Sequence, residues 1–134
     1  NKTNNNIFIN NLQLNSYGHE DLSHITEKDY QKYLSKVFTG FLEFIHDVHF
    51  SDKMPSNRNI CIPKLDSKYI AIFQQNKWIL KDKDTILPKF ISNKITHSSM
   101  HSLELFTNNG NVPFSILVVI VDILRKSLCN SNIV

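Results

Sequence analysis

Histidines at metal-ligand spacing are the first residues of this sequence that suggest a chemistry. His46 and His49 form a His-x-x-His pair, and Cys61 follows them along the chain. His97 and His101 have the spacing that places two side chains on one face of a helix. A zinc site needs three or four convergent ligands, and neither group carries a Cys-x-x-Cys or His-Glu-x-x-His pattern. We therefore expect no metal, no other cofactor, and histidines that are satisfied by neighbouring polar groups.

A second candidate chemistry is metal-dependent cleavage of nucleic acid by His49, Asn57 and Asn59. These residue types are those of a ββα-metal nuclease, but such a site needs a second metal-binding histidine on a following helix. The next histidine, His97, is separated from His49 by a whole run of strand-like sequence. We favour a structural role, in which Asn57 and Asn59 hold a turn through bonds to the backbone and His49 caps a helix end through its dipole. A nuclease is kept as a minor alternative.

A third candidate chemistry is nucleic-acid binding by lysines. Lys28, Lys32 and Lys36 recur every fourth residue and share one helix face. Lys77 precedes Trp78, so that charge and an aromatic ring lie side by side, a combination that holds single strands by attraction and stacking. Acidic residues are interleaved with these lysines, which is typical of a solvated face. Direct nucleic-acid binding through these five residues is therefore an alternative, and it predicts an affinity that falls steeply with salt.

Length and composition indicate one domain. The chain has 134 residues, of which 41% are hydrophobic and 20% charged, and its net charge is +3. This length suits a single core, and the charge is far below that of a dedicated nucleic-acid-binding protein. Three glycines in the whole sequence do not suffice for a phosphate-binding loop. We therefore expect no enzyme of the nucleotide-binding kind.

The two cysteines, Cys61 and Cys129, lie far apart in apolar surroundings. A secreted chain of this length more often carries a denser set of disulfides, so we expect both thiols to be reduced, in a reducing compartment. Residues 1–6 are polar and do not resemble a signal peptide. The apolar run at 112–121 is too short to span a bilayer, so we expect no membrane contact.

Residues 1–15 are rich in asparagine and stand apart from the single domain predicted over 16–134. Two pairs of apolar residues alternate with polar neighbours in this segment, which is the period of a β-strand. Asparagine is a poor strand former, so such strands would need a partner. Two interpretations stay open: the end of a linker, or an oligomerisation strand whose interface consists of Ile7, Ile9, Leu12 and Leu14.

Helical spacing of apolar residues predicts a pair of helices over 27–37 and 40–49. Thr26 and Asp29 have the spacing of a capping box at the start of the first helix. Gly40 marks the expected break between the two.

Three strand-like segments follow at 59–62, 69–73 and 77–81, and the short turns between them predict an antiparallel meander. One of these turns is Gln75-Asn76. Trp78 is expected to cover the sheet.

The remaining sequence predicts helices. Asp82 or Asp84 can cap the first of them, and Asp84 is favoured because it places Pro88 in the first turn, where proline is tolerated. A helical stretch over 98–106 and a buried apolar helix over 112–128 follow. The whole pattern predicts an α+β domain: an N-terminal helix pair, a three-stranded antiparallel β-meander and C-terminal helices.

A set of motifs spread over nearly the whole chain is similar to that of a known family. They are Ile9-Asn10-Asn11, Tyr17-Gly18, the run from Glu20 to Thr26, His49-Phe50, Pro55, Asn57, Asn59-Ile60, Lys68-Tyr69-Ile70, Asn76-Lys77-Trp78 and residues 124–134. On these motifs the chain resembles an uncharacterised C-terminal domain of giant (nucleocytoplasmic large DNA) virus proteins, which often follows zinc-finger-like segments. The resemblance implies a viral, DNA-associated context and no catalytic residue. It implies structural roles for His49, Pro55, Asn57, Asn59, Tyr69 and Trp78.

The leading hypothesis is a non-enzymatic viral module that mediates self-association or contact with another viral protein. Direct nucleic-acid binding is the alternative, and a virion structural component or a metal-dependent nuclease are further ones. We expect the chain in the cytoplasm of the host cell, within the viral factory, or in the virion, and not secreted.

Overall fold

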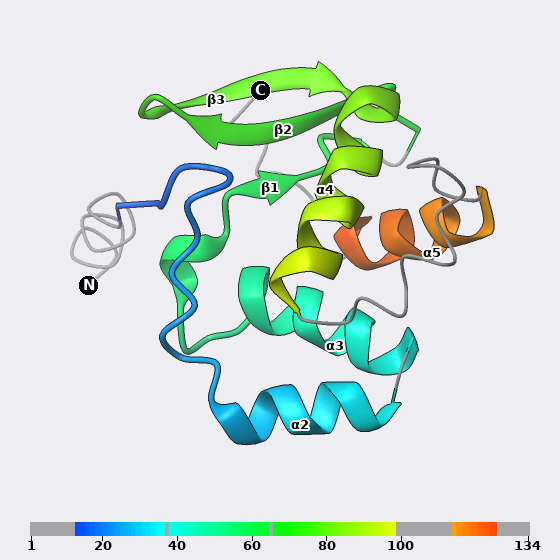
Figure 1. The fold of residues 1–134 in the computed structure, drawn as a ribbon. Helices are drawn as coiled ribbons and strands as arrows, with labels where there is room; N and C mark the ends of the chain where they lie inside the picture. The colour runs from blue at the N-terminus through cyan, green and yellow to red at the C-terminus, as the bar shows by residue number, and fades with distance from the viewer. Residues whose placement is uncertain (1–12, 37, 65, 99–113, 126–134) are drawn as a thin grey trace, which may run out of the picture.

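The computed structural model describes residues 13–36, 38–64, 66–98 and 114–125 (Figure 1). The elements in chain order are α2 (Glu27–Lys36), α3 (Phe38–His49), the 3-10 helix η1 (Pro55–Asn57), β1 (Ile60–Cys61), β2 (Tyr69–Gln74), β3 (Lys77–Asp82), α4 (Lys83–His97) and α5 (Phe114–Arg125). The predicted α+β class is confirmed, with a helix pair, a three-stranded antiparallel sheet and C-terminal helices in the expected order. The expectations for residues 1–12 lie outside the described residues, and so does all but Ser98 of the helix expected over 98–106.

The capping box predicted at the start of α2 is present. The amide of Thr26 donates to Oδ2 of Asp29 at 2.9 Å, and the amide of Asp29 donates to Oγ1 of Thr26 at 3.1 Å. These bonds satisfy donors that the start of a helix leaves without partners in the helix itself. Local sequence therefore explains where α2 begins.

The predicted break at Gly40 is wrong, because α3 begins at Phe38 and contains Gly40. A Cβ atom added to Gly40 would stand 2.0 Å from the backbone oxygen of Tyr33 in α2. Glycine is therefore required here by the close approach of the two helices and not by a turn. Tyr33 is itself buried, and its hydroxyl donates to Oδ2 of Asp47 in α3.

The sheet is the expected meander, with the strand order β1-β2-β3 and antiparallel pairing throughout. Gln75 and Asn76 connect β2 to β3 with φ angles of 52° and 64°. A type I′ hairpin turn requires this left-handed conformation at both central residues, and asparagine tolerates it well. β1 is shorter than predicted and ends at Cys61.

Helix α4 begins at Lys83, directly after β3, so its N-cap is Asp82 and not the expected Asp84. Pro88 consequently lies beyond the first turn of the helix. The pairing of the hairpin sets this boundary, because the amide of Lys83 still donates to the carbonyl oxygen of Lys68 at 2.9 Å. A proline in the helix interior removes one helix hydrogen bond, and the buried apolar residues of α4 offset that loss.

One core joins the helices to one face of the sheet. Figure 1 shows α4 beside the sheet, and α2 and α3 on the side of the molecule away from β3. The buried apolar residues come from α2, α3, β1, β2, α4 and α5, whereas β3 contributes the partly buried Ile79. Helix α5 lies within the predicted range and buries Ile120 and Leu124 in this core.

Cys61 is disulfide-bonded, which corrects the prediction that its thiol is reduced. The sequence contains one other cysteine, Cys129, which lies outside the described residues. Sequence spacing carries no signal for a disulfide between distant residues, since the fold decides which cysteines meet. The expectation of a reducing compartment rested on reduced thiols and loses that support.

Candidate interaction surface

The register of the strands defines two faces of the sheet. Residues directly opposite each other share a face, and neighbours along a strand lie on opposite faces. Ile70 and Ile72 of β2 therefore share a face with Ile60 of β1, which pairs with Ile72. These three side chains are buried in one core with Phe90 of α4. We call this the inner face.

The outer face carries the alternate residues of β2 and β3: Tyr69, Ala71 and Phe73, and opposite them Asp82, Leu80 and Trp78. Tyr69 is 51% exposed and Leu80 is 46% exposed, although both side chains are large and mainly apolar. Phe73 and Trp78 are half-buried and pack edge to face, with ring centroids 5.6 Å apart. Ala71 and its partner in β1, Cys61, lie on the same face and are buried. The exposed apolar part of the outer face is thus the area of Tyr69 and Leu80.

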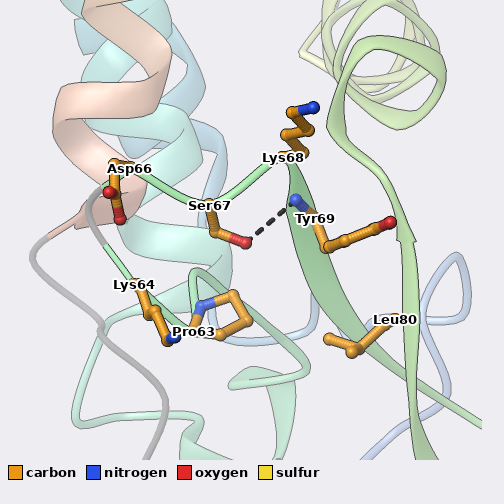
Figure 2. Close-up of a pocket in the computed structure, with 7 residues that line it drawn as sticks. All are labelled: Pro63, Lys64, Asp66, Ser67, Lys68, Tyr69 and Leu80. Carbon is orange, nitrogen blue, oxygen red and sulfur yellow. Dashed lines mark hydrogen bonds between the residues drawn. The ribbon is translucent and has the colours of Figure 1, made fainter.

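A pocket of about 370 Å³ adjoins Tyr69 and Leu80 (Figure 2). Its other walls come from the connection between β1 and β2: Pro63, Lys64, Asp66, Ser67 and Lys68. Figure 2 shows Pro63 on one side of the pocket and Tyr69 and Leu80 on the other. A concave site with apolar walls can receive an apolar side chain from a partner.

Four exposed charged residues surround this apolar centre. Lys64, Asp66 and Lys68 line the pocket, and Asp82 stands opposite Tyr69 at the end of β3. Figure 2 shows the side chains of Lys64 and Lys68 pointing away from each other. An apolar centre with a charged rim is the usual anatomy of a protein–protein contact surface.

Ser67 holds the wall of the pocket in place. Its hydroxyl oxygen accepts a hydrogen bond from the amide of Tyr69 at 2.9 Å, the dashed line in Figure 2. Its carbonyl oxygen accepts one from the ammonium group of Lys83 at 2.8 Å. The connection is therefore tied to both β2 and α4, and the charged residues beside Ser67 are positioned by the fold.

The polar residues that suggest a nuclease, His49, Asn57 and Asn59, do meet, but they meet inside the molecule. All three are 0% exposed. Nδ1 of His49 lies 3.1 Å from the carbonyl oxygen of Asn57 and 3.0 Å from Oδ1 of Asn59. Both partners are acceptors, so we assign the ring proton to Nδ1. Burial lowers the pKa of His49 to about 3, so the ring is neutral and is not the charged helix cap expected from its position.

Asn57 and Asn59 attach the N-terminal segment to this cluster. The side chain of Asn57 accepts from the amide of Asp21 at 2.9 Å and donates to its carbonyl oxygen at 2.7 Å. Asn59 donates to the carbonyl oxygen of Asn15 at 3.1 Å. These are bonds from side chain to backbone, as expected, but they join segments distant in sequence and not the residues of one turn.

An ion pair completes the cluster. Nζ of Lys94 lies 3.1 Å from Oε1 of Glu20, and the two side chains are 5% and 6% exposed. Burial is the largest influence on Glu20 and raises its pKa, but the charge of Lys94, the neighbouring His49 and hydrogen bonds from Asn59 and Lys94 together leave that pKa below its usual range. Removing one partner of such a pair is strongly destabilising, because it leaves a buried charge without compensation. With its members enclosed, the cluster holds segments together and presents nothing to a substrate.

The nucleic-acid hypothesis combines two groups of residues that the fold places apart. Helix α2 carries Lys28, Lys32 and Lys36, and it lies on the far side of the molecule from β3, which carries Lys77 and Trp78 (Figure 1). The five residues therefore do not form one continuous surface.

The interface expected at Ile7, Ile9, Leu12 and Leu14 lies outside the described residues except for Leu14, which is half-buried in the loop before α2. Sequence reasoning missed Leu80 as a surface residue. The available signal was the run Trp78, Ile79, Leu80, because consecutive apolar residues in a strand place apolar side chains on both faces of a sheet.

The chain was compared with protein-family models, with curated proteins and with solved structures, and none of them matches it. The resemblance to giant-virus proteins therefore stays a prediction. Within the part of the chain that the structure describes, no three His, Cys, Asp or Glu residues are grouped to hold a metal ion. None of the helices in that part has the length and apolar character needed to cross a membrane.

Proposed function

We propose that this domain is a non-enzymatic protein-contact module and that the outer face of its sheet is the contact surface. The observation that carries the proposal is the joint exposure of Tyr69 and Leu80 beside a pocket. Exposure of large apolar side chains to water costs free energy, and a partner that covers these side chains removes that cost. The charged residues around them supply the polar rim of such a contact.

The resemblance to giant-virus proteins suggests the setting in which this contact is made. In that setting the domain is the contact part of a DNA-associated viral protein and follows a zinc-finger-like segment. It joins that protein to another viral protein or to further copies of itself, in the viral factory or in the virion.

Leu34 provides a matched control for a test of this function. It is 48% exposed, close to the value for Leu80, but it lies on α2, far from the sheet (Figure 1). The wild-type chain, Leu80→Lys and Leu34→Lys are immobilised and exposed to an extract of the cells in which the protein is made, and the retained proteins are identified by mass spectrometry. We expect at least one protein, either a different one or the chain itself, to bind the wild type and Leu34→Lys but not Leu80→Lys. Retained proteins that are the same for all three chains would contradict the proposal.

A further inference from the structure

Strand β3 is an edge of the sheet. Within the described residues it pairs with β2 alone, because the strand order is β1-β2-β3. Figure 1 shows β3 along the border of the sheet, with β2 on one side of it. Four of its six residues are exposed, including Lys77, Leu80 and Lys81. An edge strand carries backbone amides and carbonyl groups that face away from the sheet, and a further strand can pair with them.

The register shows which backbone groups of β3 face outward. The amide of Phe73 donates to the carbonyl oxygen of Asn59 at 2.9 Å, and its carbonyl oxygen accepts from the amide of Tyr17 at 2.7 Å. Both groups of Phe73 therefore point away from β3. In an antiparallel pair, residues bonded to the partner strand alternate with residues that are not. Trp78, opposite Phe73, consequently turns its amide and carbonyl group to the open edge, and so does Leu80, two residues further on.

Trp78 and Leu80 also carry side chains of the outer face. The outward backbone groups thus lie beside the exposed side chain of Leu80 and the half-buried ring of Trp78. An extended chain supplies donors and acceptors at the spacing of alternate strand residues, about 7 Å, which neither a helix nor a nucleic acid does. The side chains of an added strand would also cover part of Leu80. These two features favour one kind of occupant, an extended peptide segment.

The charged side chains of β3 indicate the composition of that segment. They are Lys77, Lys81 and Asp82. Oδ2 of Asp82 accepts a hydrogen bond from the hydroxyl group of Thr85 at 3.0 Å, so this carboxylate is engaged at the start of α4. Lys77 and Lys81 lie on the same side of the strand and, among the described residues, form no salt bridge. Acidic side chains opposite them on an added strand would pair with both.

The charges around the hairpin act in the same direction. Residues 63–84, which contain the pocket, the hairpin and the start of α4, carry five lysines and three aspartates. One of these lysines, Lys83, donates to the carbonyl oxygen of Ser67 at 2.8 Å, a bond that leaves its charge without compensation. The excess of positive charge attracts an acidic segment and raises the rate at which it meets the edge.

A second copy of this chain fits the edge poorly. Two β3 strands can pair antiparallel only in registers that bring their outward backbone groups together. The two such registers that overlap most place Lys77 of each copy opposite either Lys81 or Lys83 of the other. Like charges directly opposite each other are destabilising. The edge therefore favours a partner with a different sequence.

We propose that β3 binds an extended peptide segment of another protein, which adds a fourth strand to the sheet. Acidic residues of this segment stand opposite Lys77 and Lys81, and apolar residues stand opposite Trp78 and Leu80. The segment therefore has two acidic residues four positions apart, with apolar residues between them. The inference rests on the proposed function, because it names the kind of partner that covers Leu80.

The first test uses a peptide of that pattern, Ser-Glu-Val-Thr-Val-Glu-Ser, acetylated at one end and amidated at the other. Its sequence reads the same in both directions, so it suits either orientation of the added strand. We expect millimolar peptide to slow the exchange of the Trp78 and Leu80 amides with water by about tenfold, measured by NMR on the full chain. The amides of Ile79 and Lys81 already bond to β2 and should change far less.

Charge reversal tests the pairing of side chains. The double variant Lys77→Glu, Lys81→Glu should bind this peptide about tenfold more weakly, and it should prefer a peptide in which both glutamates are replaced by lysine. The control, Lys28→Glu with Lys32→Glu, makes the same change of net charge at exposed positions of α2, far from the sheet (Figure 1). It should keep the preference of the wild type. The same preference in both double variants would overturn the pairing.

Methylation of the peptide backbone distinguishes an added strand from attraction between charges alone. One peptide is N-methylated at both valines and another at the threonine. In a strand, alternate amides face the neighbouring strand, so an added strand requires that one of these peptides loses binding and the other keeps it. Any other result overturns the inference.

The possible outcomes separate this inference from the proposed function. If the peptide leaves the Trp78 and Leu80 amides unchanged, the inference fails, while capture of a protein through Leu80 still supports the contact function. If the peptide binds but no captured protein depends on Leu80, the contact function fails and the strand site stands. Slow exchange of both amides without peptide also overturns the inference. It assigns the edge to a second copy if it increases with protein concentration, and to another part of the same chain if it does not.

Discussion

His49 illustrates how the fold decides the chemistry of a residue. Its spacing from His46 suggests a metal ligand, and its distance from Asn57 suggests a nuclease. In the structure, His46 is exposed whereas His49 is enclosed and neutral, with Nδ1 held by two acceptors. Nε2 of His49 is buried and has no hydrogen-bond partner. Protonation of that nitrogen would place a charge in the core, so the measurable property of His49 is its resistance to protonation.

Acid is therefore expected to destabilise the fold through His49. Its pKa is about 3 in the folded chain against an ordinary value of 6.5. Between these values the unfolded state binds the additional proton, so the free energy of unfolding falls as the pH is lowered from 6.5 toward 3. The lowered pKa of Glu20 acts in the same direction below its ordinary value of 4.5. We expect His49 to account for a loss on the order of 3 kcal/mol between about pH 6.5 and about pH 4, measured by denaturant unfolding at each pH.

The variant His49→Asn separates the titration from the packing. Asparagine keeps an N–H donor near the position of Nδ1 but has no group that titrates in this range. We expect it to lose about 2 kcal/mol at neutral pH because of the cavity, and to show a much shallower dependence on pH. His19→Gln, at an exposed position, is the control and should keep the wild-type slope. If the free energy of unfolding of His49→Asn depended on pH as steeply as that of the wild type, the effect would belong to another group.

Among the secondary-structure elements, the contact between α2 and α3 depends on one glycine. In an exposed helix, replacing glycine by alanine stabilises by up to about 1 kcal/mol. At Gly40 the added methyl group would stand 2.0 Å from a backbone oxygen, which a change of side-chain rotamer cannot relieve. We therefore predict that Gly40→Ala lowers the free energy of unfolding by about 1–3 kcal/mol, as overpacking does elsewhere.

Thr39→Ala is the control for that prediction, since Thr39 is the exposed neighbour of Gly40 in the same helix. Thermal unfolding of both variants gives the comparison. We expect Thr39→Ala to change stability little. A Gly40→Ala chain as stable as the wild type would mean that the two helices can separate at no cost.

Elements whose ends are set by local chemistry could be predicted from the sequence. The capping box of Thr26 and Asp29 defines the start of α2, and the Gln75-Asn76 turn defines the hairpin. The errors arose where contacts distant in sequence decide. Asp82 replaces the expected cap because hairpin pairing continues into Lys83, and that pairing cannot be read from helix signals alone. Gly40 was mistaken for a break for the same reason, since its partner lies in another helix.

For the molecule as a whole, the sequence predicts the inner face of the sheet better than the outer face. The isoleucines of β2 alternate as a core face should, and they are buried. Alternation says little about the outer face, because Tyr69, Leu80 and Trp78 could each be covered by another part of the same chain. The exposed fractions of Tyr69 and Leu80, which no sequence pattern supplies, identify this face as the candidate surface. Its pocket also depends on the connection held by Ser67, which periodicity does not describe.

Site-specific photo-crosslinking tests most directly whether the outer face touches another protein. Leu80 is replaced by a photoreactive phenylalanine derivative in cells that make the protein, and Leu34 is replaced in a second sample as the matched exposed leucine on α2. After irradiation, we predict covalent adducts with a protein at position 80. Position 34 should give none above background. The same yield at both positions, or no adduct at position 80, would contradict a contact surface on the outer face of the sheet.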